Sequence, residues 1–292
     1  MKIGVANFEG RERVVLGADR NELVDLTAAL GLTPATLIRF LAAKEAPELC
    51  QVALKSAATR VPLQEATLGA PAANPGKLIG VGMNYHSFVA AAGKIGMPVP
   101  AERIWFLRPS SCITGPGQQV WLPANEASLD YEVELAIIIG RRARNLTAAE
   151  AGRAIAGFTV ANDLTLRERV RKSSALAKAF ETHTPLGPWI VTPDEVPDVK
   201  SLRLQTRVNG ELRQDSSTAE MILDCAQLIA ELSAALVLSP GDVILTGTPA
   251  GCGLFERPPR WLRAGDNVRV EIDGVGALEN RVVAEPELDP LE

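Results

Sequence analysis

The sequence predicts an α+β fold, because short strand-like segments are numerous, helix signals are few and no internal repeat divides the chain. In its second half, strands are expected at residues 158–161, 189–192, 203–208, 243–246 and 268–272. Turn sequences such as Asn209-Gly210 and Pro240-Gly241-Asp242 separate them. A doubly wound sheet fits less well, since strands and helices do not alternate regularly.

The first seventy residues are expected to form a small, β-rich N-terminal domain. Residues 3–8 and 13–16 have the pattern of short strands, and residues 36–43 are expected to be helical. Residues 71–76, Pro-Ala-Ala-Asn-Pro-Gly, are typical of a linker, because Pro and Gly interrupt regular structure. A larger domain would then occupy residues 77–292, beginning with an apolar strand at 77–81.

Two helices are predicted from capping boxes, in which a Ser or Thr is followed three residues later by Glu. The first begins at Thr147, with Glu150 completing the box, and Gly157 is its expected end. The second begins at Ser217, with Glu220 completing the box. Its apolar face would carry Met221, Ile222, Cys225, Leu228, Ile229 and Leu232.

Composition excludes several classes of protein. The 292 residues contain 30 Lys and Arg against 35 Asp and Glu, with two Tyr, so neither a basic surface nor stacking aromatics favour nucleic acid as a partner. The four cysteines are far apart, which indicates reduced thiols rather than a zinc ribbon. No apolar stretch approaches the ~18 residues of a membrane helix or forms a signal peptide, so we expect a cytoplasmic protein without a membrane partner.

The most informative segment is residues 130–139, Asp-Tyr-Glu-Val-Glu-Leu-Ala-Ile-Ile-Ile. As a strand, it places Glu132 and Glu134 on one face, which continues with Ala136 and Ile138. Two carboxylates beside a strand that is buried on both faces repel each other unless a cation or a proton compensates. A divalent metal ion is the simplest compensation, and a solvated strand face is the alternative.

A third carboxylate, Asp163, follows the predicted strand 158–161, where it could also act as a helix cap. A site made of Glu132, Glu134 and Asp163 has only oxygen donors, which suits Mg²⁺ or Mn²⁺ and does not suit zinc or copper. Three carboxylates and one divalent ion leave a negative charge. Lys178 and Arg167 are therefore candidates to attract an anionic substrate, although Lys178 could be a solvated lysine.

From about residue 80 to 282 the chain resembles the fumarylacetoacetate hydrolase family. The matching segments are Gly82-Met83-Asn84-Tyr85, Pro109-Ser110-Ser111, residues 130–135, Ala161-Asn162-Asp163, Lys178-Ala179-Phe180, residues 185–189, Val208-Asn209-Gly210 with Gln214-Asp215, and residues 240–251. The resemblance implies a mixed β-sandwich or β-roll with helices outside, preceded by the small N-terminal domain. It also implies a homodimer that acts on a small-molecule 2-oxo acid.

The resemblance assigns roles to individual residues. It implies that Glu132, Glu134 and Asp163 hold Mg²⁺ or Mn²⁺, that Lys178 lies beside the substrate, and that Gly247 and Thr248 close the pocket. Substrate contacts are also expected from Tyr85, Arg108 and Arg167, of which Arg108 stands where the family has a Lys before Pro. The metal would stabilise the enolate that forms when a C–C bond of a 2-oxo acid or 1,3-dicarbonyl breaks.

The chain departs from the family where hydrolysis needs a general base. The family pattern Asn-Tyr-x-x-His-x-x-Glu supplies a His/Glu dyad that activates water, but Phe88 and Ala91 stand at those positions here. His86 comes two residues too early, about 200° away on a helix. Val170 replaces a family Gln. The catalytic candidates are therefore Lys178 with His86 or His183 as a base.

Three functions remain open from the sequence. The first expectation is a Mg²⁺- or Mn²⁺-dependent C–C hydrolase that acts on a 2,4-dioxo acid such as an acylpyruvate or a fumarylpyruvate-like compound. The alternative is a 2-oxo acid decarboxylase, tautomerase or isomerase that stabilises an enolate without activating water. A non-catalytic metabolite-binding protein is the third. Residues 88–103, rich in Gly and Pro, are expected to be a mobile lid or an ordinary surface loop.

Overall fold

The computed structural model describes residues 1–18, 21–55, 60–196 and 198–287. Its strands form one large mixed sheet, a smaller sheet and a two-stranded pair. The large sheet contains β1 (Lys2–Phe8), β2 (Arg11–Gly17), β3 (Glu22–Asp25), β4 (Arg60–Pro62), β5 (Thr67–Gly69), β6 (Leu78–Gly82), β7 (Ile104–Arg108), β8 (Ile113–Thr114), β11 (Val133–Ile139), β12 (Ile155–Asn162), β14 (Thr184–Val191) and β17 (Val243–Leu245). The smaller sheet contains β9 (Val120–Leu122), β15 (Arg203–Val208), β16 (Glu211–Ser217), β18 (Asn267–Ile272) and β19 (Gly276–Ala284), and the pair is β10 (Leu129–Asp130) with β13 (Thr165–Leu166). Most neighbouring strands pair antiparallel, and strands and helices do not alternate regularly along the chain, which confirms the α+β class.

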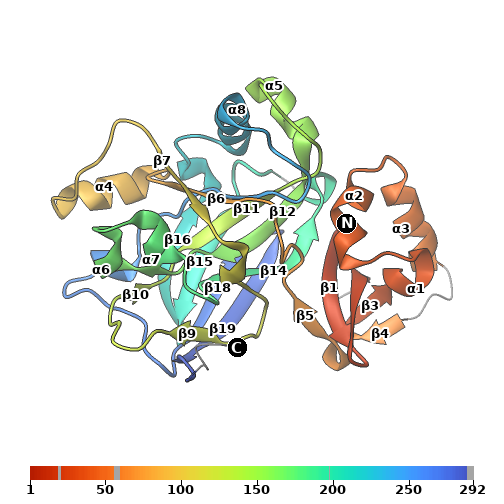
Figure 1. Ribbon diagram of the computed structural model, residues 1–292, viewed down its shortest axis with the longest axis horizontal. Helices are drawn as coiled ribbons and strands as arrows, with labels where there is room; N and C mark the ends of the chain where they lie inside the picture. Colours follow the sequence, from red (N-terminus) through yellow and green to blue (C-terminus); the bar gives the residue numbers. More distant parts are fainter. Residues whose placement is uncertain (19–20, 56–59, 197, 288–292) are drawn as a thin grey trace.

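The helices are short and lie outside the sheets. They are α1 (Leu26–Leu30), α2 (Pro34–Leu41), α3 (Ala46–Lys55), α4 (His86–Lys94), α5 (Ala148–Ala151), α6 (Arg167–Val170), α7 (Ser174–Lys178) and α8 (Cys225–Ala235). Figure 1 shows α1–α3 beside the N-terminal strands on one side of the molecule, and α4, α6 and α7 on the opposite side. In the described part of the chain, no helix is both long and apolar enough to cross a membrane.

The strand β11 lies in the middle of the large sheet, whose order is β4-β3-β2-β1-β14-β12-β11-β17-β6-β7. All its side chains are buried. Val133, Leu135 and Ile137 belong to the core between the two sheets, whereas Ala136 and Ile138 pack in a second core with residues of α1–α3. The predicted alternation of the two faces is therefore confirmed, and it places the carboxylate face of β11 opposite the core between the sheets.

The N-terminal unit contains three helices as well as strands, and the helix expected at 36–43 is α2. Backbone pairing of β1 with β14, with Lys2 opposite Val191, joins this unit to the large sheet. The division of the chain at residues 71–76 stays a prediction. The segment 88–103 is partly helical, because most of α4 lies within it.

Both predicted helices have different limits in the structure. The capping box of Thr147 and Glu150 is present, but α5 ends at Ala151 and β12 begins at Ile155. Gly157, the expected helix end, is a strand residue opposite Ile138, where an added Cβ would lie 2.6 Å from Ile190 Cγ2. Pairing with β11 therefore overrides the local helix signal.

The capping box of the second helix lies seven residues later than predicted. Ser217 still pairs with Arg203 at the end of β16, and its side chain caps only the 3₁₀ turn Thr218–Glu220. Asp224 and Gln227 form the capping box of α8 instead. The predicted apolar face is correct for Cys225, Leu228, Ile229 and Leu232, which are buried, whereas Met221 and Ile222 precede the helix.

Candidate active site

Three buried carboxylates meet where β11 and β12 lie side by side. Glu134 is in β11, Glu132 directly precedes that strand, and Asp163 directly follows β12. The antiparallel register brings them together: Glu134 lies opposite Ala161, and the Asp163 N–H donates to the Glu132 carbonyl oxygen at 2.9 Å. One oxygen of each carboxylate lies within 4.8 Å of the others. The three are 1–4% exposed, so their charges cannot be screened by solvent.

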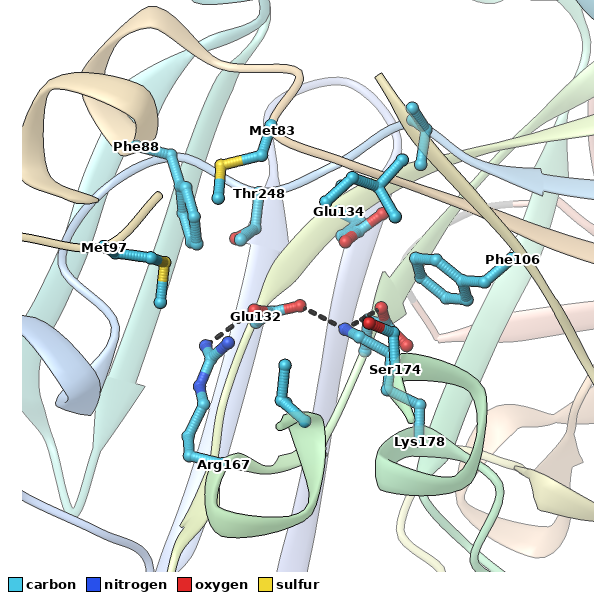
Figure 2. A pocket seen from close by; sticks show the side chains of 15 residues that line it. Met83, Phe88, Met97, Phe106, Glu132, Glu134, Arg167, Ser174, Lys178 and Thr248 are labelled. Carbon is cyan, nitrogen blue, oxygen red and sulfur yellow. Dashed lines mark hydrogen bonds and ion pairs between the residues drawn. The ribbon is translucent and has the colours of Figure 1, made fainter. Parts of the chain in front are cut away.

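Cations compensate two of the three carboxylates. Lys178 Nζ donates to Glu132 Oε2 at 2.6 Å and also to Asp163 Oδ2. Arg167 Nη2 donates to Glu132 Oε1 at 2.6 Å, while its Nε donates to Asp130 Oδ2 at 2.7 Å. Figure 2 shows Arg167 and Lys178 approaching Glu132 from two sides. Glu132 is thus held in one orientation by two charge-assisted hydrogen bonds.

The helix α7 and the strand β7 position Lys178. Ser173 caps α7 by accepting from the Leu176 N–H at 3.2 Å, and the helical spacing of four places Ser174 and Lys178 on one face. Arg108, at the end of β7, donates to Asp163 Oδ1 and to the carbonyl oxygens of Lys178 and His183, the last at 3.1 Å. Through these hydrogen bonds the buried Arg108 holds the C-terminal end of α7 next to Asp163.

Glu134 has a different environment from Glu132, because its partner is a backbone N–H. The Gly247 N–H donates to Glu134 Oε2 at 2.7 Å. Gly247 has a φ of 93°, which favours glycine, and an added Cβ would lie 3.0 Å from Asn84 Cβ. Asn84 in turn donates to the Thr246 carbonyl oxygen at 2.8 Å. The turn after β17 therefore needs a glycine to aim its N–H at Glu134.

The pKa values of the two glutamates move in opposite directions. Burial raises the pKa of Glu134 to about 8, and repulsion from Glu132 adds to the rise. Burial would also raise the pKa of Glu132, but Lys178 and Arg167 outweigh it and hold that pKa below its usual range. Glu134 is therefore the carboxylate whose charge lacks compensation from the protein.

A divalent cation fits this arrangement. Asp130, Glu132, Glu134 and Asp163 are four buried carboxylates, and within the described part of the chain Arg108, Arg167 and Lys178 are the cations in contact with them. The protein thus leaves one negative charge uncompensated at the place where the three carboxylate oxygens converge. An all-oxygen set of this kind suits Mg²⁺ or Mn²⁺, whose binding would remove the electrostatic reason for the raised pKa of Glu134.

The carboxylates form the floor of a cavity that encloses about 610 Å³ including its open mouth. Its charged lining consists of Glu132, Glu134, Asp163, Arg167 and Lys178. The rest of the lining is mainly apolar and consists of Val81, Gly82, Met83, Phe88, Met97, Ile104, Phe106 and Val170, with Ser174 and Thr248 as the polar exceptions. An apolar lining with a few convergent charged groups is the mixed character of a small-molecule site.

The structure places most of the predicted site residues at this cavity. Besides the carboxylates, Lys178, Arg167 and Thr248 line it, while Arg108 and Gly247 contact the carboxylates from behind. The Thr248 hydroxyl also accepts from Gln214 Nε2 at 2.9 Å, which holds the turn against β16.

Three other predicted residues neither line the cavity nor form hydrogen bonds to its carboxylates. Tyr85 is fully buried in the core at the start of α4, and His86 is exposed on the first turn of that helix. His183 is fully buried, its Nε2 lies 2.8 Å from the Trp121 carbonyl oxygen, and burial lowers its pKa to about 4. The geometry gives no support to either histidine as the base that was expected from the sequence.

The sequence interpretation missed four residues that build the site. Asp130 anchors Arg167 and accepts from the Gly253 N–H at 2.7 Å. The Phe106 ring faces Lys178, with Nζ 5.2 Å from the ring centre, and Met97 and Ser174 line the cavity. Periodicity held a signal for two of them. Asp130 continues the spacing of two that links Glu132 and Glu134, and Ser174 precedes Lys178 by one helical turn.

An α+β fold with an acidic, partly apolar cavity on a central strand defines the class as a small-molecule enzyme. Residues 77–283 match the family profile described as "Fumarylacetoacetate (FAA) hydrolase C-terminal", so the chain belongs to the fumarylacetoacetate hydrolase family. A mitochondrial oxaloacetate tautomerase of Bos taurus is 41% identical over 268 residues, covering 89% of this chain and 84% of the relative.

Solved structures agree with this family. A fumarylacetoacetate hydrolase from Exiguobacterium antarcticum has a TM-score of 0.85 at 32% identity, and the match covers 98% of this chain and 100% of that one. A maleylpyruvate hydrolase from Sphingobium sp. SYK-6, in complex with manganese(II) and pyruvate, has a TM-score of 0.83 at 32% identity with the same coverage. The similar proteins thus include both hydrolases and a tautomerase, and the fold predicted from the resemblance is confirmed.

Proposed function

We propose that this protein is a tautomerase that interconverts the enol and keto forms of a small 2-oxo acid, with Mg²⁺ or Mn²⁺ held by Glu132, Glu134 and Asp163. The observation that carries the proposal is the chemistry of the cavity wall. Phe88 stands where a family hydrolase has its water-activating histidine, and its apolar ring lines the cavity. Neither histidine of the chain is among the residues that line this cavity.

C–C bond hydrolysis, the first expectation from the sequence, needs a group that takes a proton from water. Tautomerisation does not use water as a nucleophile: the O–H bond of the enol breaks and a C–H bond forms at C3. Lys178 is the group at the floor that would give a proton to C3 and recover one from the enol oxygen. The relative named as an oxaloacetate tautomerase supports this choice, because it is 41% identical over most of the chain. A purely metabolite-binding role would leave the buried charged groups without a chemical use.

The residues at the floor have distinct roles in such a reaction. A bound divalent ion would supply Lewis-acid polarisation of the 2-oxo group. Lys178 holds a positive charge beside the carboxylates, where it would stabilise the negative charge of the enolate oxygen. Arg167 orients Glu132, and the Gly247 N–H orients Glu134. Phe88 and Val170 line the cavity, where their apolar side chains would exclude water from the reacting carbon.

Two further features are kept as part of the proposal. The resemblance implies a homodimer, and the cytoplasm is the compartment that we propose. Since the Bos taurus relative is named as mitochondrial, the compartment is a separate question that localisation of the tagged protein answers.

The test is to add enol-oxaloacetate to the purified protein with Mg²⁺ and follow its conversion to the keto form by ultraviolet absorbance. An acylpyruvate is the parallel substrate for hydrolysis. We expect metal-dependent ketonisation, loss of at least about 10²-fold in Lys178→Met, and no release of pyruvate from the acylpyruvate. Release of pyruvate and a carboxylic acid by the wild type would contradict the proposal, and release of CO₂ from oxaloacetate beyond the rate with free Mg²⁺ would favour a decarboxylase.

The double variant Phe88→His with Ala91→Glu tests whether hydrolysis can be gained. If the dyad is what separates hydrolysis from tautomerisation here, this variant should cleave the acylpyruvate, because a general base typically contributes about 10²–10⁴-fold. The single variant Ala91→Glu is its control, since it adds a carboxylate without the imidazole.

A further inference from the structure

One wall of the cavity is apolar, beside the charged floor. Figure 2 shows Phe88, Met83 and Met97 grouped on one side of Glu132, and Phe106 on the other side above Lys178. These side chains come from β7 and from the connection between β6 and β7, whereas the charged residues belong to or flank β11, β12, α6 and α7. A substrate whose 2-oxo acid head contacts the carboxylate floor would therefore extend its other end along this apolar wall.

The apolar wall is held in place by specific contacts. Phe88 is 7% exposed and packs edge-on against Phe255, with ring centres 5.0 Å apart and planes at 78°. Met83 has a φ of 63°, and Arg103 donates to its carbonyl oxygen. The Met97 N–H donates to the Ala92 carbonyl oxygen at 3.0 Å, which folds the chain back after α4. The wall is thus part of the folded framework and not a row of solvated side chains.

The cavity offers no spare cation to a second carboxylate. Among the described residues that line it, the cations are Arg167 and Lys178, and both already contact protein carboxylates. Arg103 is close in sequence, but it does not line the cavity and it donates to the carbonyl oxygens of Met83 and Ala101. A second carboxylate would have to lose its hydration against methionine and phenylalanine side chains.

The charge of the floor leads to the same conclusion. Its four carboxylates and three cations, with one divalent ion bound, would carry a single positive charge. One carboxylate of a 2-oxo acid neutralises that charge. A dicarboxylate would restore a buried negative charge in a region with a low dielectric constant.

We propose that Met83, Phe88 and Met97 select 2-oxo acids that carry an apolar alkyl or aryl substituent beyond the reacting carbon, in preference to short 2-oxo dicarboxylates. This inference rests on the proposed tautomerase function and specifies its substrate class. It differs from the substrate in the name of the Bos taurus relative, which is a dicarboxylate.

The test compares oxaloacetate with 4-methyl-2-oxopentanoate, in which an isopropyl group of similar shape replaces the second carboxylate. Deuterium exchange at C3 is followed by proton NMR in D₂O with Mg²⁺, and each rate is divided by the exchange rate without protein. We expect the enhancement by the wild type to be at least about tenfold greater for 4-methyl-2-oxopentanoate, as is typical when one group is matched or mismatched to an apolar pocket.

Met97→Lys adds a cation to the apolar wall and should shift this ratio toward oxaloacetate by at least about tenfold. Val99→Lys is the matched control, because Val99 is 41% exposed, lies two residues further along and does not line the cavity. It should leave the ratio within about twofold. Met83→Gln, which adds polarity without charge or branching, should lower the ratio and provides a second variant.

Two results would overturn the inference. Equal or greater enhancement for oxaloacetate, with a ratio that Met97→Lys and Met83→Gln leave unchanged, would refute the selection by the apolar wall while the tautomerase function stands. If neither substrate shows metal-dependent deuterium exchange and enol-oxaloacetate shows no metal-dependent ketonisation, the proposed function is refuted, together with the inference that rests on it.

Discussion

The electrostatic description of the site is tested most directly by Glu134→Gln. Glutamine keeps the size of the side chain and can still accept from the Gly247 N–H, but it carries no charge. In the metal-free protein, burial and Glu132 raise the pKa of Glu134 from its ordinary value of 4.5 to about 8. The variant therefore removes a buried carboxylate whose ionised form lacks a charged partner.

The magnitude follows from proton linkage. A pKa of about 8 in the folded state against 4.5 in the unfolded chain means that the folded protein binds more protons between these two values. The wild type is then most favoured below pH 4.5, and its stability falls as pH rises toward 8. The full difference corresponds to about 5 kcal/mol, and relaxation of the surroundings on ionisation reduces it to about 2–5 kcal/mol.

The assay is urea unfolding of both proteins with EDTA at pH 5 and pH 8. The free energy of unfolding of the wild type should fall relative to Glu134→Gln by about 2–4 kcal/mol between these pH values, because one proton changes stability by at most about 1.4 kcal/mol per pH unit. Adding Mn²⁺ at pH 8 should stabilise the wild type by about 2.7 kcal/mol at a concentration 100 times the Kd, and should not stabilise the variant. The control is Glu181→Gln, since Glu181 is exposed and outside the cavity.

One result would refute this reasoning. If wild type and Glu134→Gln keep a constant difference in unfolding free energy from pH 5 to pH 8 without metal, Glu134 is not a carboxylate held neutral by burial and repulsion. Equal stabilisation of both proteins by Mn²⁺ would show that Glu134 does not contribute to metal binding.

Three further predictions concern the framework of the site. Burial lowers the pKa of His183 from 6.5 to about 4, so between these pH values the unfolded chain binds one proton more than the folded protein. The free energy of unfolding should therefore fall by up to about 3 kcal/mol as pH drops from 6.5 to 4. In urea titrations, His183→Gln should show a flatter dependence of this free energy on pH. Gly247→Ala should cost about 1–3 kcal/mol and weaken Mn²⁺ binding by calorimetry, because its φ of 93° is strained for alanine; normal binding would contradict the role of the Gly247 N–H. Arg108→Met should lower the free energy of unfolding by about 3–5 kcal/mol, since it leaves Asp163 buried with one cation fewer, and a loss below about 1 kcal/mol would mean that the pair is dispensable.

Local sequence signals failed where sheet pairing competes with them. The capping box at Thr147 predicts a helix, but the residues from Ile155 onward are taken by β12, because their backbone groups pair with β11. Ser217 likewise remains in β16, and the capping box of α8 starts only at Asp224. A capping box specifies the hydrogen bonds of one turn, whereas the length of the helix beyond that turn depends on partners far away in the sequence.

The sequence by itself determined that Glu132 and Glu134 share one face of a strand, whereas pairing of β11 with β12 brings Asp163 to them. Glu132 and Glu134 precede and enter a strand whose period of two and apolar continuation place them on one buried face, and this part of the prediction needs only local geometry. The three oxygen donors also determined which metals fit, because ligand chemistry depends on residue type and not on folding. The α+β class followed from the same local patterns.

The tertiary structure decided everything that depends on residues distant in the chain. It brings Arg108 and Lys178 to Asp163, aims the Gly247 N–H at Glu134, and keeps both histidines out of the cavity. It also places Met83 and Met97 beside the floor, which no spacing in the sequence indicates. The physical reason is that burial, counter-charges and desolvation are properties of packed neighbours, and packing is set by sheet register and by the path of the connections rather than by local sequence.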